Sequence, residues 1–190
     1  MFTLFLNWMK ITAIRYYGGA RDKIARLGLA HLFLELQQII LDAKVFVLEV
    51  KDANSGAVVR EELDKGFVAA KEWKSRKTGG VDWTKRTRYN DTVLARMGVE
   101  IQVSARSDLV VRDIVHLRNK LQEAEIDIGV ICVPSDRLET FLPDRYPRFS
   151  EAVKYIEQEF KEAMLTPLVV IAVEHDGPAA TPLKKKTRKA

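Results

Sequence analysis

The chain has 190 residues, 47% of them apolar and 30% charged, which fits one soluble globular domain with a core of its own. Its single cysteine, Cys132, excludes a disulfide framework and favours a reducing cytoplasm. The net charge of +5 does not make the folded body basic, because five positive charges lie in the last seven residues, at Lys184, Lys185, Lys186, Arg188 and Lys189.

Both ends of the chain are expected to lie outside the core. Residues 1–8, MFTLFLNW, are apolar, but they are too few to cross a bilayer and lack the pattern of a signal peptide. We interpret them as an extension of the domain and expect no membrane association. A single domain is therefore placed in residues 1–178, and residues 179–190 are expected to form a flexible basic tail.

Apolar periodicity predicts strands that alternate with helices along the chain. The pattern of a strand is found in residues 10–17, 44–51, 97–103, 127–133 and 168–173. The pattern of a helix is found in residues 20–42, 57–73, 107–124 and 149–163, and residues 137–148 are irregular. This order predicts an α/β sandwich in which helices flank a central mixed β-sheet. No dinucleotide fingerprint, phosphate loop, zinc ligand set or nucleophile elbow is present in the sequence.

The segment 90–103, NDTVLARMGVEIQV, carries the pattern that points most directly to chemistry. On a strand, Glu100 and Gln102 share one face, because side chains two residues apart point the same way. Asp91 can meet Glu100 if a turn or a bent antiparallel strand brings it back. Two carboxylates beside an amide would make a hard-oxygen site suited to Mg²⁺. The plain alternative is an edge strand whose polar residues face water.

Three other residues have roles that the sequence leaves open. Asp82 is a rival to Asp91, because it follows an apolar residue and is also flanked by basic residues. Glu35, on the predicted helix 20–42, either adds a carboxylate to the metal site or lies on a solvated face or in a salt bridge. His116 could be taken for a general base, but a lone histidine among apolar residues more often packs in a core or contacts a second subunit.

The run Asp91-x8-Glu100-Ile101-Gln102, followed by Val103-Ser104 and a helix with Asp113-Ile114-Val115, resembles the catalytic segment of the BglII-type restriction endonucleases. That group is a branch of the PD-(D/E)XK nuclease fold. The resemblance covers roughly residues 61–173. Its distinctive mark is Gln102, where most of the wider fold has lysine. Asp91 is preferred to Asp82 because its spacing matches this family. Other matching segments are Glu61-Glu62-Leu63, Lys71-Glu72-Trp73-Lys74, 126–130 and 167–171.

The resemblance implies a restriction-endonuclease-like fold and Mg²⁺-dependent type II cleavage of double-stranded DNA. It implies that Asp91, Glu100 and the backbone carbonyl of Ile101 hold the metal, and that Gln102 orients the attacking water. A homodimer is also implied, with the helix 107–124 as the candidate contact. Two alternatives stay open: a repair or recombination nuclease of the same fold, and a catalytically idle DNA-binding module.

Basic residues gather just before the motif. The interval 71–88 carries seven Lys or Arg residues against Glu72 and Asp82, with Trp73 and Trp83 among them. Next to a nuclease site, such clustered charge suits the DNA backbone, whereas the plain alternative is a solvated loop. The candidates for DNA contact are Lys74, Arg76, Lys77, Lys85, Arg86, Arg88 and, after the motif, Arg106.

Overall fold

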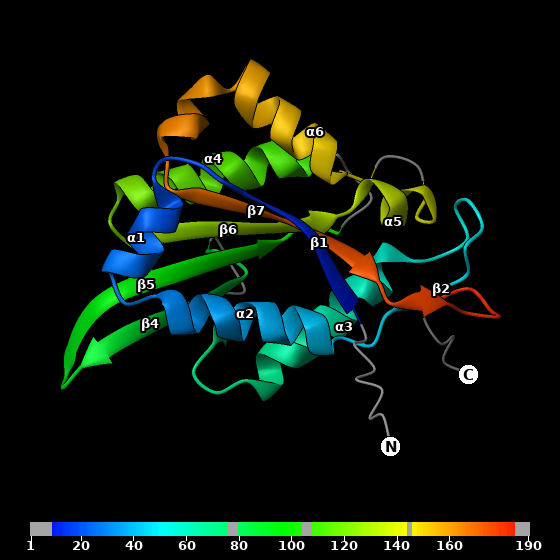
Figure 1. Cartoon of the computed structure of the whole chain (residues 1–190), viewed down its shortest axis with the longest axis horizontal. Helices are drawn as coiled ribbons and strands as arrows, with labels where there is room; N and C mark the ends of the chain where they lie inside the picture. Colours follow the sequence, from blue (N-terminus) through cyan, green and yellow to red (C-terminus); the bar gives the residue numbers. More distant parts are fainter. Residues whose placement is uncertain (1–8, 76–79, 104–107, 144–145, 185–190) are drawn as a thin grey trace.

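The computed structural model describes residues 9–75, 80–103, 108–143 and 146–184, and within them helices cover both faces of a six-stranded mixed β-sheet (Figure 1). Strands β5, β6 and β7 run parallel, whereas β1, β4 and β3 are antiparallel to their neighbours. The predicted α/β sandwich with a central mixed sheet is confirmed. In sheet order the strands are β1 Met9–Tyr16, β7 Leu168–His175, β6 Ile128–Pro134, β5 Thr92–Ile101, β4 Trp83–Tyr89 and β3 Lys74–Ser75.

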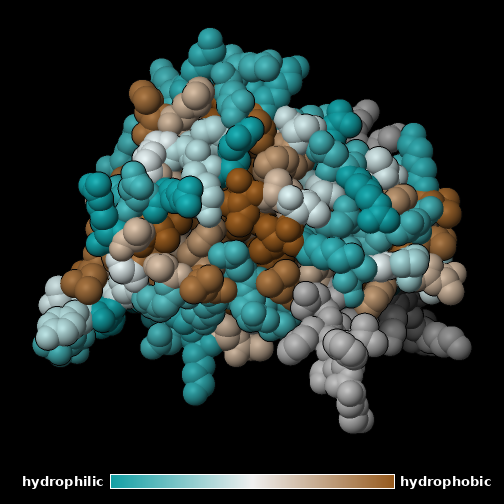
Figure 2. All heavy atoms as spheres, in the orientation of Figure 1, coloured by the Kyte–Doolittle hydropathy of each residue, from teal (hydrophilic) through white to brown (hydrophobic). Residues whose placement is uncertain are grey.

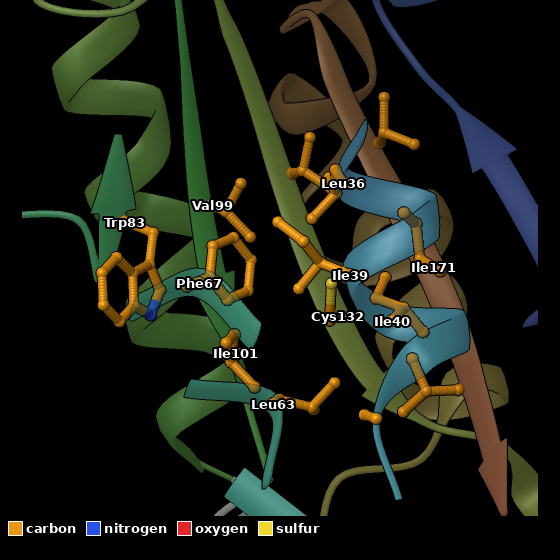
Figure 3. Close-up of a cluster of buried hydrophobic side chains, with 14 of the residues drawn as sticks. Leu36, Ile39, Ile40, Leu63, Phe67, Trp83, Val99, Ile101, Cys132 and Ile171 are labelled. Atoms are coloured by element: carbon orange, nitrogen blue, oxygen red, sulfur yellow. The ribbon is translucent and has the colours of Figure 1, made fainter. Parts of the chain in front are cut away.

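Two apolar layers hold helices against the sheet. Helices α2 (Ala30–Asp42) and α3 (Gly56–Ala69) cover one face, and α4 (Asp108–Gln122) and α6 (Phe149–Lys154) cover the other. The central strands are apolar on both sides, which is why β6 and β7 are continuous apolar runs. Figure 3 shows the first layer, where side chains from α2 and α3 meet the sheet; those labelled include Leu36, Ile40, Leu63, Phe67, Val99 and Ile101.

Several predicted elements differ from the structure. The helix predicted over 20–42 is two helices, α1 (Ala20–Arg26) and α2, because Gly28 adopts a left-handed φ of 66° between them. The strand predicted over 44–51 contains only β2 (Phe46–Val47), which pairs with β8 (Gly177–Pro178) outside the main sheet. The irregular stretch contains α5 (Asp136–Thr140). The helix predicted over 149–163 continues after α6 as a π turn at Tyr155–Glu159 and a 3-10 helix at Lys161–Leu165.

No single helix in the described part of the chain is long and apolar enough to cross a membrane. Among the described helices, one pair, α1 and α2, has the length and composition of a span when taken together, and that pair is bent by 115°. Five apolar side chains of α2 are buried in the core of this protein: Leu32, Phe33, Leu36, Ile39 and Ile40. On the face seen in Figure 2, hydrophilic side chains cover most of the surface, with a small group of hydrophobic ones near its middle.

The register of the β4–β5 hairpin determines which residues of the two strands lie side by side. Trp83 is the register partner of Val99, and Tyr89 that of Thr92, so the chain reverses at Asn90 and Asp91. Asn90 has a φ of 49°, a left-handed conformation that asparagine tolerates in turns. The second half of the basic interval is therefore a strand, not a loop. As a result, the start of β4 lies beside the end of β5, and the turn lies at the opposite end of the hairpin.

Candidate active site

Asp82 and Glu100 lie side by side because of the register of the hairpin. Asp82 immediately precedes β4, and Glu100 follows Val99, the partner of Trp83. The backbone N–H of Asp82 donates to Oε2 of Glu100 at 3.2 Å. In return, the N–H of Ile101 donates to Oδ2 of Asp82 at 2.8 Å. Two acidic side chains from neighbouring strands thus converge at the end of β5.

Asp91 does not reach this place. It is exposed in the turn at the far end of the hairpin. Nine residues of extended chain separate it from Glu100, a span of roughly 30 Å at about 3.3 Å per residue. The prediction that Asp91 and Glu100 lie together is therefore wrong, and the structure brings the rival, Asp82, to Glu100 instead.

Glu100 is buried in an acidic environment on the α4 side of the sheet. Its side chain is 6% exposed, and Nδ1 of His116 on α4 lies 2.9 Å from its Oε1. Burial, together with repulsion from Asp82 and Asp113, raises the pKa of Glu100 to about 9. Burial likewise raises the pKa of Asp113 to about 6. His116, which was expected to pack in the core or contact a second subunit, contacts the predicted metal ligand.

A cation from α3 enters the site from the other side. Nη1 of Arg60 lies 2.9 Å from Oδ2 of Asp82 and donates to the carbonyl oxygen of Ile101 at 2.8 Å. The Nε of Arg60 lies 2.8 Å from Oδ2 of Asp64, one helical turn further along α3. The other oxygen of Asp64 accepts a 2.8 Å hydrogen bond from Nε1 of Trp83. Burial alone would lower the pKa of Arg60, but Asp82 and Asp64 outweigh it and raise that pKa.

These residues surround one small pocket. Glu100 and Gln102 both line it and both are buried, as their alternate spacing predicts for a shared face. Asp113 and Arg112 line its α4 side. The complete lining is Arg60, Asp82, Glu100, Ile101, Gln102, Val103, Leu109, Arg112 and Asp113.

The donor set of this pocket fits a hard divalent cation. The carboxylates of Asp82 and Glu100 and the carbonyl oxygen of Ile101 are the oxygen ligands that Mg²⁺ and Ca²⁺ take in proteins. Burial and the nearby Asp82 and Asp113 raise the pKa of Glu100, so its ionised form would be favoured by a bound cation. Within the described residues, no group of three Asp, Glu, His or Cys side chains is arranged to hold a metal. The carboxylate of Asp82 faces Arg60, and that of Glu100 faces His116.

Glu35 and Lys85 pair with each other away from this pocket. Nζ of Lys85 lies 2.8 Å from Oε2 of Glu35 and also donates to the carbonyl oxygen of Lys71 at 2.8 Å. The Lys85 side chain is only 11% exposed. Glu35 is therefore not part of the candidate metal site, and the ammonium group of Lys85 is already paired.

The other basic candidates divide into two groups. Lys74, Arg86 and Arg88 are exposed and line an open hollow beside the hairpin. They are thus placed where a ligand can reach them. Arg76, Lys77 and Arg106 lie outside the residues that the structure describes, as do residues 1–8 and the tail from residue 185 onward.

Comparison with known families decides the class of protein. The family described as "Restriction endonuclease BamHI" matches residues 34–184, which is most of the chain and includes every described residue of the pocket. The chain belongs to the BamHI restriction endonuclease family. Membership makes it a DNA-cleaving hydrolase and confirms the restriction endonuclease predicted from the sequence. No curated protein matches the chain.

Proposed function

We propose that this member of the BamHI family is a type II restriction endonuclease with a BglII-type site, which cuts double-stranded DNA at a specific sequence using Mg²⁺. The observation that carries the proposal is the convergence of Asp82 and Glu100 at the end of β5, with Gln102 on the same strand face. The acidic pair replaces the Asp91–Glu100 pair inferred from spacing. The reducing cytoplasm expected from the single cysteine suits this role.

The residues of the pocket have different proposed roles in hydrolysis. Asp82, Glu100 and the carbonyl oxygen of Ile101 would hold Mg²⁺, which when bound lowers the pKa of a water molecule and neutralises charge on the scissile phosphate. The amide of Gln102 is too weak a base to accept a proton, so it orients the attacking water by hydrogen bonding. His116 fixes the position of the Glu100 carboxyl from α4.

A two-fold dimer would give each strand of a palindromic site its own pocket. We propose such a homodimer, with α4 as the contact helix, following the resemblance to the BglII-type enzymes. Sedimentation of the purified protein should then give twice the protomer mass of 21.6 kDa. A particle of 21.6 kDa that stays monomeric on cognate DNA would reject the dimer.

Digestion of long duplex DNA tests the proposed activity. With Mg²⁺ we expect discrete fragments whose sequenced ends share one short motif, and with EDTA we expect no cutting. A smear, or nicking only at mismatches and branches, would instead indicate a repair or recombination nuclease. Binding to DNA without cutting in any divalent metal would indicate a catalytically idle module.

The exposed arginines of β4 are expected to bind the DNA backbone. Replacing Arg86 with Ala should weaken binding to all duplex sequences alike and should lower the slope of log affinity against log salt by about two, one for each protomer of the proposed dimer. Fluorescence anisotropy in EDTA over a range of NaCl concentrations measures both effects. An unchanged salt slope would exclude Arg86 from the interface.

Lys85, the neighbour of Arg86, provides the control variant for this measurement. Replacing Lys85 with Met should leave the salt slope nearly unchanged, because its ammonium group is already paired with Glu35. The same change should lower the free energy of unfolding by about 1–3 kcal/mol, because it leaves the partly buried Glu35 without its partner. If Lys85→Met instead lowered the salt slope as much as Arg86→Ala does, the assignment of the two residues would be wrong.

A further inference from the structure

Arg60 contacts two of the three groups that we assign to the metal. Its Nη1 lies 2.9 Å from Oδ2 of Asp82 and 2.8 Å from the carbonyl oxygen of Ile101. A divalent cation held by those oxygens would stand about 2.0–2.6 Å from each of them. A guanidinium N–H and a metal ion cannot both lie at such distances between the same two oxygens. One must leave before the other binds.

We propose that Arg60 is an internal competitor of the divalent cation, an inference that rests on the proposed function. The guanidinium neutralises Asp82 in the metal-free enzyme and turns away from Asp82 and Ile101 when the ion arrives. Arg60 thereby sets the metal concentration that the enzyme needs. This role is distinct from binding metal, since a guanidinium offers only donors.

The contacts of Arg60 give its guanidinium a second partner outside the proposed ligand set. Its Nε is held by Asp64, and Asp64 is itself fixed by the indole of Trp83. Neither of these partners belongs to the proposed ligand set. A shift of the whole guanidinium toward Asp64 releases Asp82 and keeps the positive charge at the edge of the pocket. A half-buried side chain, 31% exposed, has room for such a movement.

Mn²⁺ binding without DNA tests the competition. The concentration of free Mn²⁺ can be followed by electron paramagnetic resonance during titration of the purified full-length protein. We expect Arg60→Met to bind Mn²⁺ at least about tenfold more tightly than the natural protein, because the ion no longer displaces a charge-assisted hydrogen bond. Arg60→Gln, which also removes the charge but keeps a polar side chain, should show the same direction and serves if Arg60→Met does not fold.

Arg112→Met is the matched control. Arg112 lines the same pocket, and its side chain is 71% exposed. Its loss changes the net charge equally, but among the described side chains it pairs with the carboxylate of Asp113 at 3.6 Å, which is not a proposed ligand. We expect a change in Mn²⁺ affinity of less than about threefold for this exposed charge. If the Arg60 variants bind Mn²⁺ no more tightly than Arg112→Met does, the competition is overturned.

Asp82→Asn separates failure of this inference from failure of the proposed function. If Asp82→Asn binds Mn²⁺ as tightly as the natural protein does, or if no variant binds it, the proposed metal site itself is wrong. If binding needs Asp82 but the Arg60 variants show no gain, only the competition fails. Thermal unfolding adds a second readout, because Mn²⁺ should raise the Tm of Arg60→Met more than that of the natural protein.

Discussion

Replacing Asp82 with Ala is expected to lower the rate of DNA cleavage by roughly 10³-fold or more, because the change removes one of two carboxylates that would hold the catalytic ion. The carboxylate also accepts the backbone N–H of Ile101 and pairs with Arg60, so its loss disturbs the ligand carbonyl as well. Single-turnover cleavage of a supercoiled plasmid with saturating Mg²⁺ measures the effect. Circular dichroism should show that the variant remains folded.

Asp91→Ala is the control for this variant. Its side chain is exposed in the hairpin turn, so we expect a cleavage rate within about threefold of the natural rate. Asp82→Asn, which keeps an acceptor for the N–H of Ile101, should be nearly as inactive as Asp82→Ala. Should Asp91→Ala be inactive while Asp82→Ala cuts normally, the assignment taken from spacing would be right and the one taken from geometry would be wrong.

Replacing Glu100 with Gln is expected to stabilise the metal-free protein while it abolishes cleavage. The buried carboxyl faces Asp82 and Asp113, so its ionised form is unfavourable without a cation. Gln keeps the shape of the side chain and removes the charge. In EDTA at pH 8 we expect a Tm about 2–8 °C higher than that of the natural protein, which corresponds to roughly 1–2 kcal/mol for a chain of this size. Cleavage should fall by roughly 10³-fold or more.

The sign of the pH dependence follows from the direction of the pKa shift. The pKa of Glu100 is about 9 in the folded protein, above its ordinary value of 4.5. Between these pH values the folded protein holds a proton that the unfolded chain has released, so the free energy of unfolding falls as pH rises. The gain from Glu100→Gln should therefore be small near pH 5 and grow toward pH 9.

Thermal unfolding over this pH range, with Glu61→Gln as the control, measures the effect. Glu61 is an exposed residue of α3, and its replacement should give no gain that grows with pH. A Glu100→Gln protein that is no more stable than the natural one at pH 8 would show that Glu100 carries no electrostatic strain. Added Mg²⁺ should raise the Tm of the natural protein and leave that of Glu100→Gln nearly unchanged.

The buried strands and long helices could be predicted because their apolar patterns leave few choices. Strands β6 and β7 are apolar on both faces. The bounds of β6 differ from the predicted 127–133 by one residue, and β7 extends two residues beyond the predicted 168–173. The split of α1 from α2 was missed because the apolar face continues across Gly28, whereas the backbone breaks there. A positive φ at glycine is not visible in periodicity.

The β4–β5 hairpin was not predicted, for a different reason. Because of this error, Asp91 and not Asp82 was assigned to the metal site. No strand was predicted in the basic interval 71–88, but Trp83, Lys85 and Thr87 share the core-facing side of β4. The aliphatic stem of Lys85 crosses that side to reach Glu35, so a charged residue occupies a half-buried position. Asn90-Asp91 between two strands was the available signal for a turn. With that turn recognised, Asp91 lies at the tip and Asp82 lies opposite Glu100.

Arg60 and His116 could not have been assigned from spacing. Each comes from a different helix, on opposite faces of the sheet, and they meet Asp82 and Glu100 only through tertiary packing. The one local signal was Asp64, four residues after Arg60 on α3, which predicts an ion pair along the helix but no link to β5. Glu100 and Gln102 were identified correctly as neighbours on one face, since alternation on a strand is a local property.

The most direct test of the central claim is to locate a bound divalent cation. Crystals of the protein grown with Mn²⁺ allow the ion to be placed by its anomalous scattering. The expected result is a peak about 2.0–2.6 Å from carboxylate oxygens of Asp82 and Glu100 and from the carbonyl oxygen of Ile101. A peak at Asp91, or a fully occupied Mn²⁺ elsewhere with none beside Glu100, would contradict a cutting centre at the end of β5.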